Sequence, residues 1–409
     1  MYWKNISKVF TGTVVAQAIP LLASLAIARL FSPQSFGEYS LWLGVSLIIS
    51  VFITLRLETL IAVVEPGKDR NEAFIATIIS IILIASALLT ISILMHNINL
   101  SFISRFPYNA AYLWIFGGAI IALSGVILSY LSAEGAYSKL TIYRVFLAFT
   151  IAFSQIISSI ISTESNSLVY SYMGSSFLVA IIYIISLKKI DWKDFKFQTF
   201  YLFVIKYKRY PSISLPAGTM NSISAELPVI VITTKYGADI GGAVALTMKV
   251  LGAPIGLVGL SILDVFKKYA ADDYRNEGNC RSVYIKTLKA LTGMSFLVLI
   301  GIIFFAESII SLAYGDEWQL SGTIALWLAP LFCMRFIASP LSYVFYISGK
   351  LEYDLYWQCG LFVFTLCTFF LLSDYKISLI VYSFGYSFLY LLYLFISYKL
   401  SLGQVARQK

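Results

Sequence analysis

The stretch KKIDWKDFKFQTFYLFVIKYKRYP, residues 188–211, is the longest polar interruption in a chain that otherwise consists of long apolar segments. It carries seven basic and two acidic residues, with aromatic and aliphatic side chains between them. Apolar residues interleaved with charges are typical of a helix that lies on a membrane surface. We therefore expect 188–211 to link two parts of the chain and to include an amphipathic surface helix.

Six apolar segments precede this linker and six follow it. Each has about 20 residues or more, enough to cross a hydrocarbon core of about 30 Å as a helix. The sequence therefore predicts an all-α integral membrane protein with 12 transmembrane helices in two six-helix lobes, residues 1–187 and 212–409. The segments are 9–30, 38–64, 72–95, 110–131, 141–162, 167–187, 212–234, 240–264, 288–310, 321–347, 352–372 and 377–399.

Basic residues fall almost entirely on one side of the membrane that these segments define. The N-terminus, the even-numbered loops and the C-terminus, with the adjoining segment ends, hold 23 of the 30 Lys and Arg residues. The odd-numbered loops hold three, Arg105, Lys235 and Lys376. This is the positive-inside pattern, so both termini and the linker are predicted to be cytoplasmic.

Composition excludes several classes of protein. The 409 residues are 59% hydrophobic and 12% charged, too apolar for a soluble domain. The net charge of +9 lies in short loops beside apolar segments, where it faces lipid headgroups, so nucleic acid is not the expected partner. The first segment is longer than the apolar region of a signal peptide, so we expect it to be retained.

Motifs for catalysis are absent from the sequence. It contains no GxxxxGK[ST], HExxH or GxSxG motif, and its one histidine, His96, falls at a segment end. None of the four cysteines forms a CxxC pair, so neither a disulfide nor a metal site is predicted. We therefore expect a protein that is not an enzyme and uses no cofactor.

Four basic and at least two acidic residues fall inside the apolar segments. A charge at the bilayer centre costs about 2.5–3.5 kcal/mol on insertion scales, so a set of this size is expected to face a shared, wetted interior. Arg56, Lys249 and Arg335 are placed well inside their segments by the rise per residue. The six are Arg29, Arg56, Lys249, Arg335, Glu58 and Glu226.

These charges leave an excess of four bases over two acids, which predicts a cationic cavity for an anionic ligand. Phosphate suits such a site because the Arg guanidinium binds it through two parallel hydrogen bonds. Two interpretations of Arg29 stay open, a cavity residue or a side chain that snorkels to the membrane surface. Arg56 and Glu58 are two positions apart, so in a helix they would not pair directly, and Arg56 either pairs elsewhere or lines the cavity.

Two stretches carry a family resemblance. GTVVAQAIPLLASLAIARLFSPQSFGEYSLW at 12–42, followed by LRLETLIAVVEP at 55–66, resembles the start of Wzx-type O-antigen and polysaccharide flippases of the multidrug/oligosaccharidyl-lipid/polysaccharide (MOP) exporter superfamily. The stretch 210–259 resembles the seventh and eighth helices of the same family. The resemblance spans essentially the whole chain.

The resemblance implies two six-helix lobes around a central cavity, alternating access, and a substrate of undecaprenyl-pyrophosphate-linked oligosaccharide. The resemblance assigns Arg56 and Glu58 to an LRxE element of the family, and it places Lys249 where the family usually has a basic residue. Glu226 stands where an amide such as Gln is expected, which bears on substrate choice or ion coupling. A polysaccharide polymerase and a chain-length regulator are the partners that the resemblance suggests.

The sequence thus predicts a flippase of the bacterial inner membrane that moves a lipid-linked O-antigen or similar repeat unit to the outer leaflet. Arg56, Lys249, Arg335 and Arg29 are the expected substrate-binding residues. Glu58 and Glu226 are expected to couple transport to protons or sodium. Two alternatives stay open: a cation-coupled multidrug antiporter of the same superfamily (MATE-like), whose cavity should be acidic, and an integral-membrane polymerase or glycosyltransferase, which should carry a large outer loop or clustered acids.

Overall fold

A computed structural model describes residues 2–97, 108–187, 190, 192, 196–208 and 210–403. Within these residues the fold is helical, and no strand occurs. Eleven helices are long and apolar enough to cross a membrane, and a further apolar helix, Gln17–Leu30, lies within α1. The predicted all-α, multi-pass membrane architecture is therefore confirmed, while the count of twelve spans and the cytoplasmic termini stay predictions.

The chain forms two compact units, Met1–Thr233 and Thr234–Lys409. The sequence divides the lobes at 188–211, whereas the units divide one transmembrane helix later. The reason is that α8 contacts α2, since Glu226 of α8 lies against Gly44 and Gly218 of α8 lies against Arg56. The helices of the first unit are α1 (Tyr2–Leu30), α2 (Pro33–Ile53), η1 (Leu57–Ala62), α3 (Lys68–Asn97), α4 (Tyr108–Ala133), α5 (Tyr137–Ser158), α6 (Ser165–Ser186), α7 (Phe197–Lys206), η4 (Tyr210–Ser214) and α8 (Leu215–Tyr236).

Helix α2 is held in the first unit by α4. Ser32 caps its N-terminus by accepting a hydrogen bond from the Ser35 amide, and Pro33 follows at the first helical position. The indole of Trp42 donates to the Leu113 carbonyl at 2.9 Å. A Cβ at Gly117 would lie 2.5 Å from the Trp42 ring, so only glycine permits this close approach of the two helices. This packing places the end of α2, where the candidate site lies.

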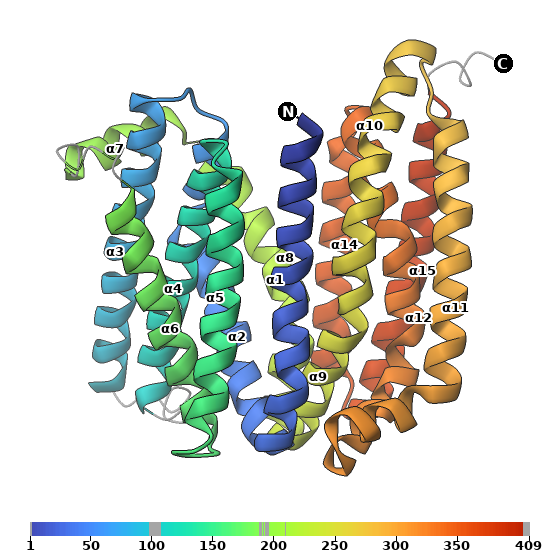
Figure 1. The fold of residues 1–409 in the computed structure, drawn as a ribbon, viewed down its shortest axis with the longest axis horizontal. Helices are drawn as coiled ribbons and strands as arrows, with labels where there is room; N and C mark the ends of the chain where they lie inside the picture. The colour runs from blue at the N-terminus through green and yellow to red at the C-terminus, as the bar shows by residue number, and fades with distance from the viewer. Residues whose placement is uncertain are drawn as a thin grey trace. The chain divides into compact units, whose positions relative to one another are not determined.

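Helix α7, within the predicted linker, lies across one end of the first unit (Figure 1). Lys206 forms an ion pair of 3.1 Å with Asp69 at the start of α3, and this hydrogen bond raises the pKa of the Lys206 ammonium. Phe203 is buried, whereas Phe197 and Tyr201 are exposed. An exposed apolar face on a helix at the end of a bundle agrees with the predicted surface helix.

The second unit is built around α12, which packs against α9, α11 and α15. Ser295 of α11 donates to the Cys333 carbonyl of α12 at 3.1 Å, and Thr247 of α9 donates to the Ser321 carbonyl at 2.9 Å. The remaining elements are α9 (Ala238–Pro254), η5 (Ile255–Gly259), α10 (Leu260–Glu277), α11 (Arg281–Tyr314), η6 (Asp316–Trp318), α12 (Gln319–Leu341), α13 (Val344–Ile347), α14 (Leu351–Leu371) and α15 (Tyr375–Ser401).

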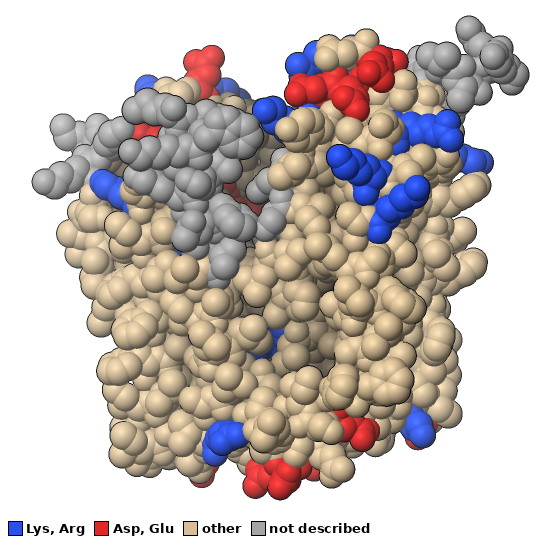
Figure 2. Space-filling view, turned by 45° about the vertical axis from the view of Figure 1, so that its right-hand side comes forward, with Lys and Arg blue, Asp and Glu red and all other residues tan. Residues whose placement is uncertain are grey.

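Charged side chains of the second unit gather at its ends. Figure 2 shows Lys, Arg, Asp and Glu over α10 and the start of α11, above a broad band of other residues. A band with few charged residues is expected where a bilayer core covers the helices. This distribution within the unit agrees with a membrane protein.

Candidate functional site

The α2 helix is broken at the position of two predicted site residues. The sequence predicts one continuous segment at 38–64, but α2 ends at Ile53 and a 3₁₀ helix begins at Leu57. Between them, Leu55 and Arg56 have φ values of 52° and 59°, in the left-handed region that side chains with a Cβ rarely adopt. The prediction of one continuous helix over 38–64 is therefore wrong. Backbone strain of the kind seen at Leu55 and Arg56 is common at functional sites.

The break brings Arg56 and Glu58 together. The Arg56 guanidinium Nη1 lies 3.3 Å from the Glu58 carboxylate Oε1. The expectation that residues two positions apart do not pair is wrong here, because it assumes a continuous α-helix and Arg56 is in the left-handed conformation. The pairing is incomplete, since the buried Arg56 Nε and Glu58 Oε2 atoms have no hydrogen-bond partner in the part of the chain that the structure describes. Unsatisfied donors and acceptors of this kind are costly and mark a site that a ligand can complete.

Helix α8 packs against the side chain of Arg56. A Cβ built on Gly218 would lie 2.9 Å from Arg56 Nε and 3.1 Å from its Cδ, so the side chain rests on a bare stretch of helix backbone. The hydroxyl of the next residue, Thr219, is also buried and has no hydrogen-bond partner among the residues described. Arg56 is thus held between the break in α2 and the small residue on α8.

Glu226 lies two turns further along α8, about 12 Å from Gly218 by the rise of a helix. Its carboxylate approaches Gly44 of α2, where a Cβ would lie 3.3 Å from Oε2. Among the described residues, Glu226 makes no ion pair or hydrogen bond. Among the described residues it is therefore a half-buried acid against Gly44 of α2, without a cation of its own.

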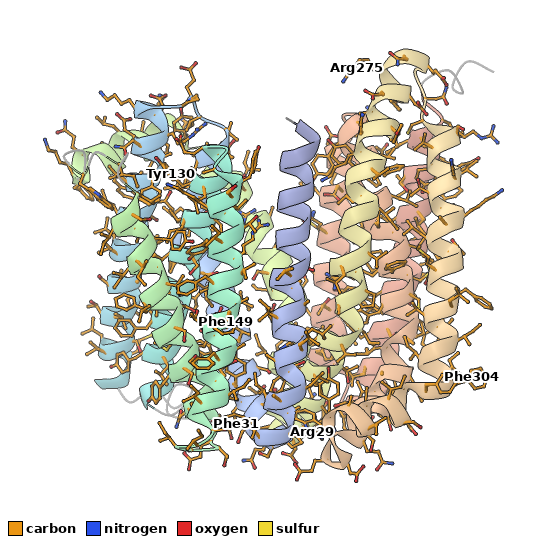
Figure 3. The ribbon with its side chains drawn as sticks, viewed as in Figure 1. Arg29, Phe31, Tyr130, Phe149, Arg275 and Phe304 are labelled. Carbon is orange, nitrogen blue, oxygen red and sulfur yellow. The ribbon has the colours of Figure 1, made fainter. Side chains whose placement is uncertain are left out.

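Arg29 lies at the C-terminal end of α1, in its last turn and exposed. Figure 3 shows it at the end of the first unit opposite to Tyr130. A cation in the last turn of a helix interacts favourably with the helix dipole. This position agrees with the second interpretation of Arg29, a side chain at the membrane surface, and its role in substrate binding stays a prediction.

Lys249 is the twelfth residue of α9 and lies at the middle of the apolar stretch Ala238–Gly259. The side chain is half-buried. Among the described residues of the chain, it has no ion-pair or hydrogen-bond partner. A lysine in the middle of a membrane helix without a neutralising acid requires water or a ligand.

Arg335 lies on α12 and is exposed, six residues before the helix ends at Leu341, or about 9 Å along its axis. Its charge interacts with Tyr382, Tyr386 and Tyr390, which follow one face of α15 at intervals of four residues. The hydroxyl of Tyr386 is hydrogen-bonded to Thr365 at 2.6 Å. The second unit thus sets one exposed guanidinium beside a row of tyrosines.

Two buried polar clusters are absent from the sequence-based predictions. Arg70 Nη1 lies 2.8 Å from Glu134 Oε1 and donates to the Ala133 carbonyl, while its Nε donates to the Ile61 carbonyl. The sequence did not indicate the pair of Arg70 and Glu134, because both residues lie near segment ends, where charges are normally solvated. In the second cluster, Asp354 accepts hydrogen bonds from Tyr393 at 2.7 Å and from Gln358 at 2.8 Å. The one feature of the sequence that could have indicated this cluster is the acidic residue in the first turn of α14.

The described residues contain no group of three or more His, Cys, Asp or Glu side chains that could hold a metal ion. The arrangement instead offers cations for an anion. In the first unit Arg56 and Glu58 are brought together, and Glu226 lies two turns along α8 from the residue that contacts Arg56. The second unit carries Lys249 and Arg335 on two helices that pack together, α9 and α12.

The chain matches known proteins over most of its length. A sequence model of the family described as "Polysaccharide biosynthesis protein" matches residues 26–322. The capsular polysaccharide biosynthesis protein CapF of Staphylococcus aureus is 23% identical over 396 residues, which cover 91% of this chain and 93% of CapF. The teichuronic acid biosynthesis protein TuaB of Bacillus subtilis (strain 168) is 24% identical over 152 residues, and this match covers 37% of the chain and only 31% of TuaB.

Solved structures share the fold at low sequence identity. The lipid II flippase MurJ, in an inward closed conformation, aligns with a TM-score of 0.75 at 16% identity, covering 95% of this chain and 87% of MurJ. An inward-facing multidrug resistance MATE family transporter of the MOP superfamily aligns with a TM-score of 0.61 at 16% identity, covering 96% and 94%. The predicted resemblance to MOP-superfamily proteins is therefore confirmed at the level of the fold.

Proposed function

Because the chain belongs to the polysaccharide biosynthesis protein family, and is a multi-pass membrane protein with a MurJ- and MATE-like fold, we propose that it is a flippase. Its substrate is an oligosaccharide linked to undecaprenyl pyrophosphate, an O-antigen or related repeat unit. It carries this lipid from the cytoplasmic to the outer leaflet of the bacterial inner membrane by alternating access. A polysaccharide polymerase and a chain-length regulator act on the product.

The observation that carries the proposal is that each unit holds, within an apolar stretch of its sequence, a cation that is not fully neutralised. Lys249 has no acidic partner among the described residues, and Arg56 keeps a buried Nε without an acceptor. Such charges are expensive in a bilayer and mark the pathway of an ionic substrate. A diphosphate supplies the acceptors that both sites lack, and Arg56 can hold it through two parallel hydrogen bonds.

Transport of a labelled substrate tests this proposal. The protein is reconstituted with a fluorescent lipid-linked oligosaccharide, and the fraction accessible to a membrane-impermeant quencher is followed over time. Leaflet exchange that depends on the protein is expected. Export of a cationic dye without lipid exchange would instead support the antiporter. Elongation of the glycan by the purified protein would support the polymerase or glycosyltransferase.

Membrane topology is tested by cysteine labelling. Lys196→Cys should be protected from a membrane-impermeant maleimide in intact cells, while Ser165→Cys should react, because the basic side of the protein is cytoplasmic. The native Cys280 is buried and just precedes α11, and burial raises the pKa of its thiol to about 12, so it stays protonated and unreactive near pH 8. Labelling of Lys196→Cys from outside would refute the topology.

The position of Arg56 depends on the missing side chain at Gly218. Gly218→Ala places a methyl group within about 3 Å of the guanidinium and displaces it, so transport should fall about tenfold with little change in thermal stability. Gly125→Ala, where an added Cβ meets nothing within 4 Å, is the matched control. Arg56→Lys should also lower the rate, because an ammonium lacks the bidentate geometry. Wild-type rates in both Gly218→Ala and Arg56→Lys would refute a positioned guanidinium.

Membrane potential is expected to drive the transport. An inside-negative potential favours outward movement of an anion, and each charge carried across gains about 2.3 kcal/mol per 100 mV. A pyrophosphate with about two charges would therefore gain up to about 5 kcal/mol per 100 mV. Transport in proteoliposomes should accelerate under an imposed potassium-diffusion potential, with pH and sodium held equal. An unchanged rate would leave ion coupling through Glu58 or Glu226, or the substrate gradient, as the driving force.

A further inference from the structure

Two of the three basic residues in the odd-numbered loops come together at one end of the second unit. Lys235 lies in the last turn of α8, and Lys376 is the second residue of α15. The Lys235 ammonium donates to the Leu372 carbonyl at 2.7 Å, just before α15 begins. Figure 1 shows α10 at the opposite end of this unit. Two lysines on the side of the membrane where the charge asymmetry disfavours them thus share one place in the fold.

A row of three aromatic rings joins the two lysines. The ring of Tyr236 lies 5.9 Å from that of Tyr375, which in turn lies 6.3 Å from the ring of Trp327 on α12. The Lys235 ammonium lies 5.2 Å from the centre of the Tyr236 ring, and the Lys376 ammonium lies 5.6 Å from that of Trp327. An ammonium over an aromatic face is attracted by the ring. Side chains from α8, α12 and α15 therefore position both cations together.

The charges of this lysine pair are available to a ligand. Both side chains are exposed, and neither forms an ion pair in the part of the chain that the structure describes. The acids nearest to them in the sequence are turned elsewhere. Asp374 accepts a hydrogen bond from the Ile377 amide as the cap of α15, and the Asp239 carboxylate approaches Gly237. An ammonium has three donors, so the lysine bound to a carbonyl keeps two of them free.

We propose that Lys235 and Lys376 bind the diphosphate of the lipid substrate on the outer side of the membrane, an inference that rests on the proposed function. A diphosphate carries more negative charge than the single phosphate of a bilayer phospholipid, so a pair of ammonium groups favours it. Lysine binds phosphate as a point charge, without the two parallel hydrogen bonds of an arginine such as Arg56. This chemistry suits a site that receives the translocated lipid and then releases it.

Chemical labelling of the lysine amines tests this site. The full-length protein in phosphatidylcholine nanodiscs is acetylated by a membrane-impermeant reagent, with and without undecaprenyl diphosphate that carries no sugar, and modification of each lysine is followed by mass spectrometry. Labelling of Lys235 and Lys376 should slow about tenfold at a ligand concentration of about ten times Kd, since only the unoccupied site reacts. Lys286, which is exposed near the start of α11, should react at an unchanged rate.

Substitution of one lysine tests whether the pair acts together. Lys376→Gln should raise the Kd measured by protection of Lys235 about tenfold, the loss expected for one charged hydrogen bond. Lys399→Gln is the matched control, because Lys399 is an exposed lysine over an aromatic ring, that of Phe395, at the other end of the same helix. It should leave this Kd unchanged.

Three results would overturn the outer site. They are equal protection by phosphatidylglycerol, which would assign the lysines to bilayer headgroups, equal protection of Lys286, which would indicate general charge screening, and unprotected lysines in a protein that carries out leaflet exchange. The wild-type protein alone decides all three, so they do not depend on the folding of a variant. Absence of leaflet exchange in the wild-type protein would instead overturn the proposed function.

Discussion

Lys249→Ala is expected to lower the rate of lipid-linked oligosaccharide transport roughly 10- to 150-fold, the range that corresponds to losing one charged hydrogen bond of about 1.5–3 kcal/mol. Folding should not suffer, because Lys249 makes no ion pair or hydrogen bond among the described residues. Removing an uncompensated charge from a membrane helix should leave the thermal midpoint unchanged or raise it. The transport rate in proteoliposomes and the unfolding midpoint in detergent are the two measurements.

The matched control for this substitution is Lys286→Ala, which removes an exposed ammonium near the start of α11 in the same unit. Its transport rate should stay close to that of the wild type. A normal rate in Lys249→Ala would show that Lys249 does not contact the substrate. A lost rate together with a lowered unfolding midpoint would show that the lysine stabilises the fold instead.

Arg70→Ala is expected to reduce the free energy of unfolding by about 3–5 kcal/mol, because it takes the buried guanidinium away from the Glu134 carboxylate, whose side chain is only 17% exposed. The same change removes the donors to the Ile61 and Ala133 carbonyls, which tie the η1 segment to the end of α4. Denaturant unfolding in detergent measures the loss. The double variant Arg70→Ala, Glu134→Gln should recover part of it, since the negative charge that faced Arg70 is then gone.

Lys68→Ala gives the comparison for a surface ion pair. Lys68 begins the same helix, lies 3.9 Å from Glu72 and is 79% exposed, so its loss should cost less than about 1 kcal/mol. Equal effects in Arg70→Ala and Lys68→Ala would contradict the structural role of the buried pair.

The length of the apolar segments and the charge asymmetry of the loops were enough to predict the all-α membrane fold, because both are local properties of the chain. The same local reasoning located Arg56, Glu58, Glu226, Lys249 and Arg335, since a charge inside an apolar segment is visible without coordinates. The family resemblance of 12–66 and 210–259 added the expected substrate class. These predictions need no knowledge of which helices meet.

Tertiary structure decided what those residues touch. The sequence around the break after Ile53 contains no glycine or proline that would predict it. Leu55 and Arg56 adopt positive φ angles because the surrounding helices hold them in this conformation. Contact between Gly218 and Arg56, and the burial of Arg70 against Glu134, join positions 162 and 64 residues apart in the sequence. The sequence by itself determined which charges fall within apolar segments, whereas packing alone decided which are neutralised, because pairing depends on distances between helices that no local pattern encodes.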